Sequence, residues 1–128
     1  MNFQQTNKAI YLQIADHICD LILAGTLEPG GRLPSVRDNA AEFEVNANTM
    51  MRSYDYLQQL GLIYNKRGIG YFVAEDAPLK ILASRRKSFM SNELEYFFRH
   101  LNMFGVTGDR LAEAYREYQS TGTLPPVD

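Results

Sequence analysis

Two short helical segments joined by a tight turn constrain the fold of this chain more than any other feature. Ser35 stands where a helix N-cap is expected, and the helix that it opens extends to about Phe43. Asn46 is a second good N-cap, and it opens a longer helix that ends near Leu60, just before Gly61. A turn of only a few residues between two helices predicts a helix-turn-helix.

The residues on either side of this pair predict another helix and a β-hairpin. Apolar residues recur at helical spacing from Ala9 to Ala24, and the next residue is a glycine that can end the helix. After the second helix of the pair, the pattern changes to two short β-prone runs, 62–64 and 71–73, with turn residues and a basic pair between them. This order of elements predicts a winged helix-turn-helix domain over residues 1–76.

Residues 77–128 have a different character and predict a two-helix appendage. The first helix is expected from residue 79 to about residue 104, and Thr107 can cap the last one. The first helix has an apolar face too large to leave exposed on a monomer, so we expect a homodimer interface. The alternative is that this face packs back on the winged helix. The residues expected at the interface are Phe89, Leu94, Phe97, Phe98, Leu101 and Phe104.

The composition limits the fold class and the surroundings of the protein. The chain has 128 residues and no apolar run near the ~20 residues of a membrane span, and Met1–Thr6 lack the features of a secretory signal. Cys19 is the single cysteine, so no internal disulfide can form, and a buried thiol is expected. We therefore expect a soluble, cytoplasmic protein that is mostly α-helical, with one small β-hairpin and no membrane segment.

Residue groupings typical of enzymes are missing from the sequence. His17 and His100 lie far apart, and no Cys/His or Ser/His grouping is present. Gly68-Ile69-Gly70 lacks the third glycine of a dinucleotide-binding loop and follows no βα unit. Two C-terminal helices also leave little volume for a pocket of ~300 Å³ or more. We expect no enzymatic activity, no metal and no cofactor, and no residue pattern identifies a small-molecule effector.

Polar residues on the second helix of the pair are of the kind that contact DNA. At 100° per residue, Met50, Tyr54 and Leu57 fall on one side as core residues, and polar side chains fall opposite. Asn, Thr and Arg can reach base edges and phosphates from a helix in the major groove, and a helix N-terminus favours an anion. The net charge of −2 means that the contact needs a local cluster of cations. The candidate DNA contacts are Arg37, Asn46, Asn48, Thr49, Arg52, Lys66 and Arg67.

Each of these residues also has an ordinary structural explanation. Asn46 could be a cap without a ligand, and Arg52 could lie on a solvated helix face. Lys66 and Arg67 could form an ordinary polar hairpin tip. The coincidence of a short turn, a polar helix face and a basic hairpin favours DNA binding. The alternative function is a winged helix that contacts another protein, which would show no salt-dependent affinity for DNA.

Four blocks of the sequence resemble the GntR family of bacterial transcription regulators. They are Leu33–Arg37, Val45–Met50, Leu57 with Gly61–Ile63, and Lys66–Val73. The resemblance covers roughly residues 8–74, and the blocks occur in order at the family's spacing. It implies a winged helix-turn-helix that binds double-stranded operator DNA as a homodimer, usually as a repressor. A two-fold dimer matches a palindromic operator.

The resemblance also implies roles for individual residues. It places phosphate contacts at the start of the first helix of the pair, further contacts on the recognition helix, and others at the wing. Many members have arginine where this chain has Ala47, and arginine or lysine where it has Met51, which predicts weaker or differently placed base readout. The short C-terminal segment is more similar to the YtrA branch, which lacks large effector domains. The residues implied at DNA are Ser35, Arg37, Asn46, Asn48, Thr49, Arg52, Lys66, Arg67 and Gly68.

Overall fold

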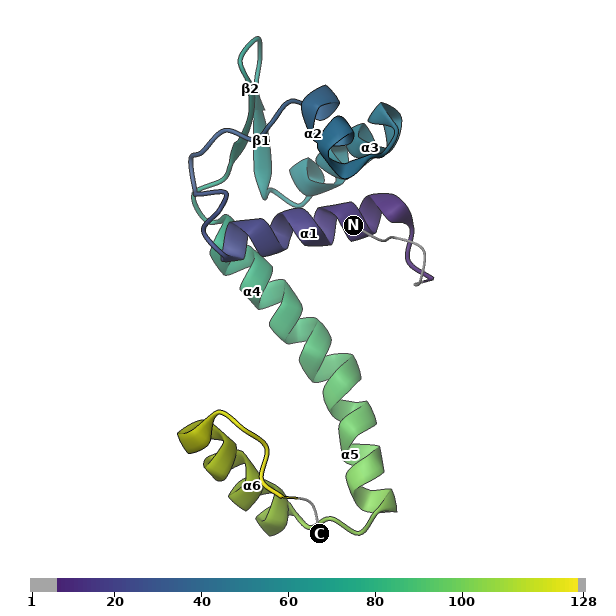
Figure 1. The fold of residues 1–128 in the computed structure, drawn as a ribbon, viewed down its shortest axis with the longest axis vertical. Coiled ribbons are helices and arrows are strands. Elements are labelled where there is room, and N and C mark those ends of the chain that lie inside the picture. Colours follow the sequence, from purple (N-terminus) through teal and green to yellow (C-terminus); the bar gives the residue numbers. More distant parts are fainter. Residues whose placement is uncertain (1–6, 127–128) are drawn as a thin grey trace. The chain divides into compact units, whose positions relative to one another are not determined.

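The computed structural model describes residues 7–126, which form helices and one β-hairpin (Figure 1). The mostly helical fold predicted from the sequence, a winged helix-turn-helix followed by C-terminal helices, is confirmed. Met1–Thr6, which bear on the expected lack of a secretory signal, lie outside the described residues. In chain order, the elements are α1 (Ile10–Leu23), α2 (Val36–Phe43), α3 (Ala47–Gln59), β1 (Ile63–Lys66), β2 (Gly70–Val73), α4 (Ala77–Ser88), the π-helical turn η1 (Phe89–Glu93), α5 (Leu94–Met103) and α6 (Gly108–Thr121).

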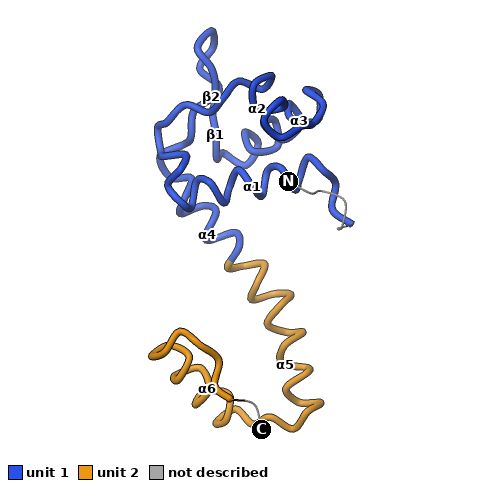
Figure 2. Tube along the Cα trace, viewed as in Figure 1, with its two compact units in different colours: residues 1–85 blue, residues 86–128 orange. Residues whose placement is uncertain are grey.

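The chain divides into two compact units, residues 1–85 and 86–128 (Figure 2). The first turns of α4 belong to the N-terminal unit, because Ala77 and Ile81 are buried in its core. The functional boundary after residue 76, between a DNA-binding domain and a dimerisation segment over residues 77–128, stays a prediction.

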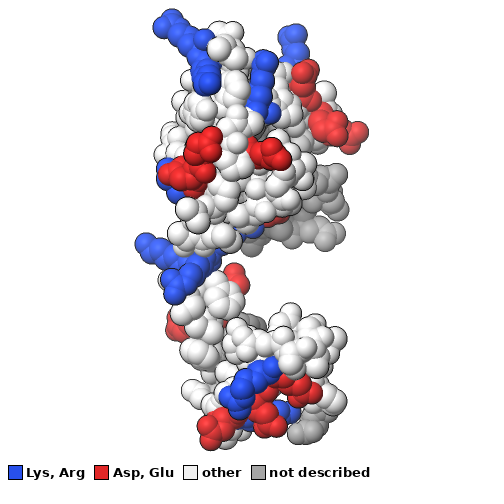
Figure 3. Space-filling model, turned by 90° about the vertical axis from the view of Figure 1, so that its left-hand side faces the viewer, with Lys and Arg blue, Asp and Glu red and all other residues white. Residues whose placement is uncertain are grey.

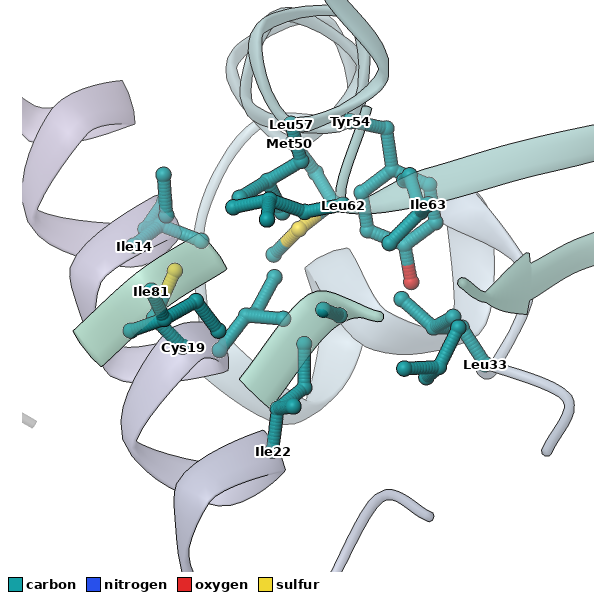
Figure 4. Close-up of a cluster of buried hydrophobic side chains, with 14 of the residues drawn as sticks. Ile14, Cys19, Ile22, Leu33, Met50, Tyr54, Leu57, Leu62, Ile63 and Ile81 are labelled. Atoms are coloured by element: carbon teal, nitrogen blue, oxygen red, sulfur yellow. The ribbon is translucent and has the colours of Figure 1, made fainter. Parts of the chain in front are cut away.

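One apolar face each of α1 and α3 packs into the core of the N-terminal unit, which the hairpin and the first turns of α4 complete (Figure 4). Burying a Leu or Ile side chain stabilises a fold by about 1.5–3 kcal/mol, so this packing fixes how both helices are rotated. The predicted core side of α3, with Met50, Tyr54 and Leu57, is confirmed, since all three are fully buried. The largest fully buried side chains are Ile14, Ile18, Ile22, Met50, Tyr54, Leu57, Ile63 and Val73.

Tyr54 carries a buried hydrogen-bond network that joins α3 to α2. Its hydroxyl donates to the carbonyl of Pro34 at 2.7 Å and accepts from the side-chain amide of Asn39 at 3.0 Å. Burial raises the pKa of Tyr54 to about 12, so the hydroxyl stays protonated as the donor that Pro34 requires. The network therefore fixes the position of α2 relative to α3.

We expect the substitution Tyr54→Phe to lower the free energy of unfolding by about 1–3 kcal/mol, because it leaves a buried carbonyl and amide without their partner. Tyr64→Phe removes a hydroxyl from an exposed side chain of the hairpin and serves as the matched control. Urea denaturation measures both changes. Equal stability of the Tyr54→Phe variant and the wild type would contradict a structural role for this network.

The turn between α2 and α3 is as tight as the sequence predicted. Glu44 has φ 56° and ψ 46°, a left-handed conformation that ends α2. The N–H groups of Glu44 and Val45 donate to the carbonyls of Ala41 (3.2 Å) and Ala40 (3.0 Å), the pattern of a helix C-cap. Residues other than glycine adopt this conformation at a cost of roughly 1–2 kcal/mol.

We expect Glu44→Gly to raise the free energy of unfolding by up to about 1 kcal/mol, because glycine removes the steric cost of the left-handed conformation. Glu42→Gly, inside α2, is the control and is expected to lower stability by about 1 kcal/mol through its poorer helix propensity. Thermal and urea unfolding measure both variants. A loss of stability in both would show that Glu44 contributes something beyond its conformation.

The helical backbone is continuous from Ala77 to Met103, through α4, η1 and α5. The single long helix predicted here therefore exists, although it starts two residues before the expected position 79. Pro78 is tolerated because the N–H groups of the first helical turn have no partner within the helix. The π-helical turn at Phe89–Glu93 was not predicted, because its signal is a shift of hydrogen bonds and not a residue pattern.

Candidate nucleic-acid interface

The N-terminal end of α2 is capped as the sequence predicted. The Ser35 hydroxyl accepts a hydrogen bond from the Asp38 N–H at 3.1 Å. Arg37 follows in the first turn of α2 and is exposed. No ion pair holds Arg37 within residues 7–126, so its guanidinium is available for an anionic ligand.

The N-terminal half of α3 presents an exposed polar face. The side-chain oxygen of Asn46 accepts from the Asn48 N–H at 2.7 Å, so Asn46 is the predicted N-cap. Asn48 is exposed and Thr49 is half-buried. Ala47, where many family members have arginine, is also exposed, so its small side chain leaves part of this face without a donor.

Arg52 packs against α1, which the sequence did not indicate. Its guanidinium carbon lies 4.1 Å from the centre of the Tyr11 ring, and Tyr11 in turn meets the Tyr56 ring edge-on at 6.1 Å. A guanidinium over an aromatic face gains a cation–π attraction and keeps the N–H groups on its edge. The exposed Arg52 side chain is thus held at the seam between α1 and α3.

The hairpin, residues 63–73, is called the wing below. Lys66 is opposite Gly70 in the register, and its ammonium lies 4.7 Å from the centre of the Phe72 ring, which stacks on Tyr64 at 5.8 Å. The turn contains Arg67, which is exposed, and Gly68, whose φ of 79° suits a glycine. Lys66 therefore rests on the strands, whereas Arg67 lies in the turn itself.

The wing is locally positive although the chain as a whole is acidic. Residues 61–74 contain Lys66 and Arg67 and no Asp or Glu. Figure 3 shows Lys and Arg side chains at the top of the N-terminal unit, where Figure 1 places the hairpin tip. A local cluster of cations of this kind attracts phosphate within about a Debye length, ~8–10 Å, whatever the net charge.

Arg32 is a cation near the wing that sequence reasoning did not assign to the site. Its guanidinium donates to the carbonyl of Ile69 at 2.6 Å. The residue types of Glu28–Pro34 are typical of turns, and they do not indicate that a side chain from this stretch reaches the hairpin. In contrast, Arg85 is engaged away from the wing, in an ion pair with Asp20 at 2.7 Å.

Cys19 is the buried thiol that the sequence predicted. Its residue is 8% exposed, and burial raises its pKa to about 11, with a smaller opposing effect of Arg85. A thiol of this pKa is a poor nucleophile near neutral pH. Within residues 7–126, no group of three or more His, Cys, Asp or Glu side chains is placed to hold a metal ion, and no helix could cross a membrane.

The C-terminal unit has an open apolar groove. No side chain of η1, α5 or α6 is buried in the single chain, and Phe104, just after α5, is exposed. None of the six residues expected at the dimer interface is therefore buried. A groove of about 620 Å³ lies between α5 and α6. The expectation of little pocket volume is therefore wrong for the single chain, because the two helices do not close on each other. The groove residues include Phe89, Leu94, Phe97, Phe98, Leu111, Tyr115 and Tyr118.

These features together define a winged helix-turn-helix, a class of DNA-binding fold. Family comparison is more specific, since the model of the bacterial regulatory proteins of the gntR family matches residues 10–73. The chain belongs to the GntR family of bacterial transcription regulators, as its four sequence blocks predicted.

Similar proteins cover almost the whole chain. The crystal structure of a GntR-family transcriptional regulator from Bacteroides thetaiotaomicron matches this one with a TM-score of 0.79. The match covers 90% of this chain and 100% of that chain, and the two sequences are 49% identical. The HTH-type transcriptional regulator YhcF of Bacillus subtilis is 36% identical over 92% of this chain and 96% of its own length. The transcriptional repressor YtrA of the same organism is 29% identical over 88% of this chain and 86% of its own length. These likenesses support the YtrA-like branch.

Proposed function

We propose that this chain represses transcription by binding a palindromic operator as a homodimer. The observation that carries the proposal is the exposed polar N-terminal half of α3, which follows a capped tight turn and is accompanied by a basic wing. An α-helix with such a face fits the major groove of B-DNA. Repression is supported by the name of the similar YtrA protein, a transcriptional repressor.

In this proposal α3 is the recognition helix. Asn48 and Thr49 contact base edges, and Arg52 reaches DNA from its position over Tyr11. Arg37 and the N-termini of α2 and α3 contact phosphates and set the register on the duplex. Ser35 and Asn46 contribute by holding those N-termini open toward the phosphates, since their side chains serve as caps.

The wing contributes a second set of phosphate contacts. Lys66 and Arg67 supply the charge, and Gly68 lets the backbone approach DNA closely because it has no side chain. Each cation that neutralises a phosphate releases counterions, so the affinity must fall as salt rises.

The proposed dimer covers the apolar face of the C-terminal unit. Phe97 is 43% exposed, Phe98 is 47% exposed and Phe104 is 70% exposed, which is unfavourable for large aromatic side chains in water. A two-fold axis through this unit would pair each groove with the same surface of a second copy. The dimer would then place two recognition helices about one helical turn of DNA apart, ~34 Å.

We expect Asn48→Ala and Arg52→Ala each to weaken operator binding by about 1–3 kcal/mol. A base contact would also lose selectivity between the operator and scrambled duplex, whereas a phosphate contact would weaken both duplexes equally. Arg116→Ala, on exposed α6, removes the same charge as Arg52→Ala and is its control. Fluorescence anisotropy with the DNA upstream of the gene, titrated with salt, measures these effects.

Selective, salt-dependent binding by the wild type supports the operator-binding function. Binding that is absent, or equal on scrambled duplex and independent of salt, would contradict it and favour the winged helix as a protein-binding module. A wild type that binds DNA while neither α3 variant changes affinity would reject α3 as the recognition helix.

We expect Phe97→Arg to convert the dimer to a monomer, because a charge in an apolar interface lacks a partner. Leu60→Glu, which places a charge on a 49% exposed side chain of the N-terminal unit, should leave the dimer intact. Sedimentation velocity measures the mass of both variants. A dimeric Phe97→Arg variant, or a monomeric wild type at micromolar concentration, would show that α5 is not the interface.

A further inference from the structure

Arg32 lies before α2, and its backbone pairs with the wing. It forms an isolated antiparallel bridge with Phe72 of β2. The Leu33 N–H then donates to the Tyr71 carbonyl at 2.9 Å. The segment that precedes α2 thus lies along the free edge of β2 and supports a hairpin whose own strands have only four residues each.

The Arg32 side chain runs toward the turn along the face of the wing that carries Phe72. Bridge partners such as Arg32 and Phe72 point to the same face of a sheet, and Gly70 lies two residues away on that face. The guanidinium donates to the carbonyl of Ile69, in the turn, at 2.6 Å. A charged donor on a neutral carbonyl makes a short, comparatively strong hydrogen bond.

Gly70 leaves the space that the guanidinium occupies. A Cβ built on Gly70 would lie 3.0 Å from Nε and 3.3 Å from Nη2 of Arg32. Gly70 also has a φ of 144°, which other residues rarely adopt. A side chain at position 70 would therefore require the guanidinium to shift.

Arg32 and Lys66 place two positive charges on the same face of the wing. No acidic side chain forms an ion pair with Arg32 among residues 7–126, and Lys66 lies across the strands from Gly70 on the same face. Two cations flanking one glycine repel each other in the free protein. A phosphate bound at the wing would reduce the repulsion between them.

We propose that Arg32 is a positioning residue that holds the tip of the wing in its DNA-binding orientation. Its bond to the Ile69 carbonyl fixes the turn, and through the turn it places Lys66 and Arg67. The expected effect of Arg32 on operator binding rests on the proposed DNA-binding function. The restraint on the turn does not, because it can be measured without DNA.

Hydrogen exchange in the DNA-free protein tests the restraint. The Ile69 N–H donates to the Lys66 carbonyl at 2.9 Å and reports opening of the turn. In Arg32→Ala we expect this amide to exchange about tenfold faster, the effect of losing one charge-assisted hydrogen bond. Arg116→Ala, which also removes one exposed arginine, should leave it unchanged. An unchanged rate in Arg32→Ala would overturn the proposal, whatever the DNA measurements show.

A double-mutant cycle on operator DNA tests the route of action. We expect Arg32→Ala to weaken binding about tenfold alone and to cause little further loss in a Lys66→Ala, Arg67→Ala background, because it acts through those side chains. Additive losses, with a salt slope lowered by about one in Arg32→Ala, would show a direct phosphate contact and overturn the positioning role. A wild type without selective DNA binding would refute the proposed function, and the exchange rate would then decide on the restraint alone.

Discussion

Burial of one face of α3 is the constraint on which the rest of the N-terminal unit depends. Met50, Tyr54 and Leu57 are fully buried, and they fix the rotation of the helix about its axis. With 3.6 residues per turn, that rotation also decides which side chains are exposed, so Asn48 and Arg52 face away from the core. The Tyr54 hydroxyl adds a bond to the loop before α2. The residues that stabilise the fold therefore also present the polar face.

Features that depend on neighbours in the sequence could be predicted from it. The caps at Ser35 and Asn46 arise from hydrogen bonds that reach two or three residues along the chain, and residue type alone indicates them. The same holds for the core side of α3, since the period of a helix is constant. These local signals were sufficient to predict the winged helix-turn-helix before any contact between elements was known.

Contacts between distant residues could not be predicted in this way. Arg32 reaches Ile69, and Arg52 reaches Tyr11, only because the fold brings separate elements together. In the C-terminal unit, the apolar pattern predicted helices. The open groove between α5 and α6 depends on the distance between these helices, which the hydrophobic period of each helix does not determine. The roles of the candidate residues at DNA and at the dimer interface remain predictions, because both partners lie outside a single chain.

None of the side chains described for residues 86–126 is buried in the single chain, so in the proposed dimer the stability of this unit would depend on the amount of protein. In the proposed dimer its helices would gain apolar packing from association, so their stability would rise with protein concentration by mass action. At low concentration the separated chains would expose aromatic surface that proteases and chaperones recognise. As its concentration falls, such a dimer would dissociate and its chains would be degraded faster. The amount of two-fold symmetric protein would therefore depend more steeply on concentration than that of a protein folded as a monomer.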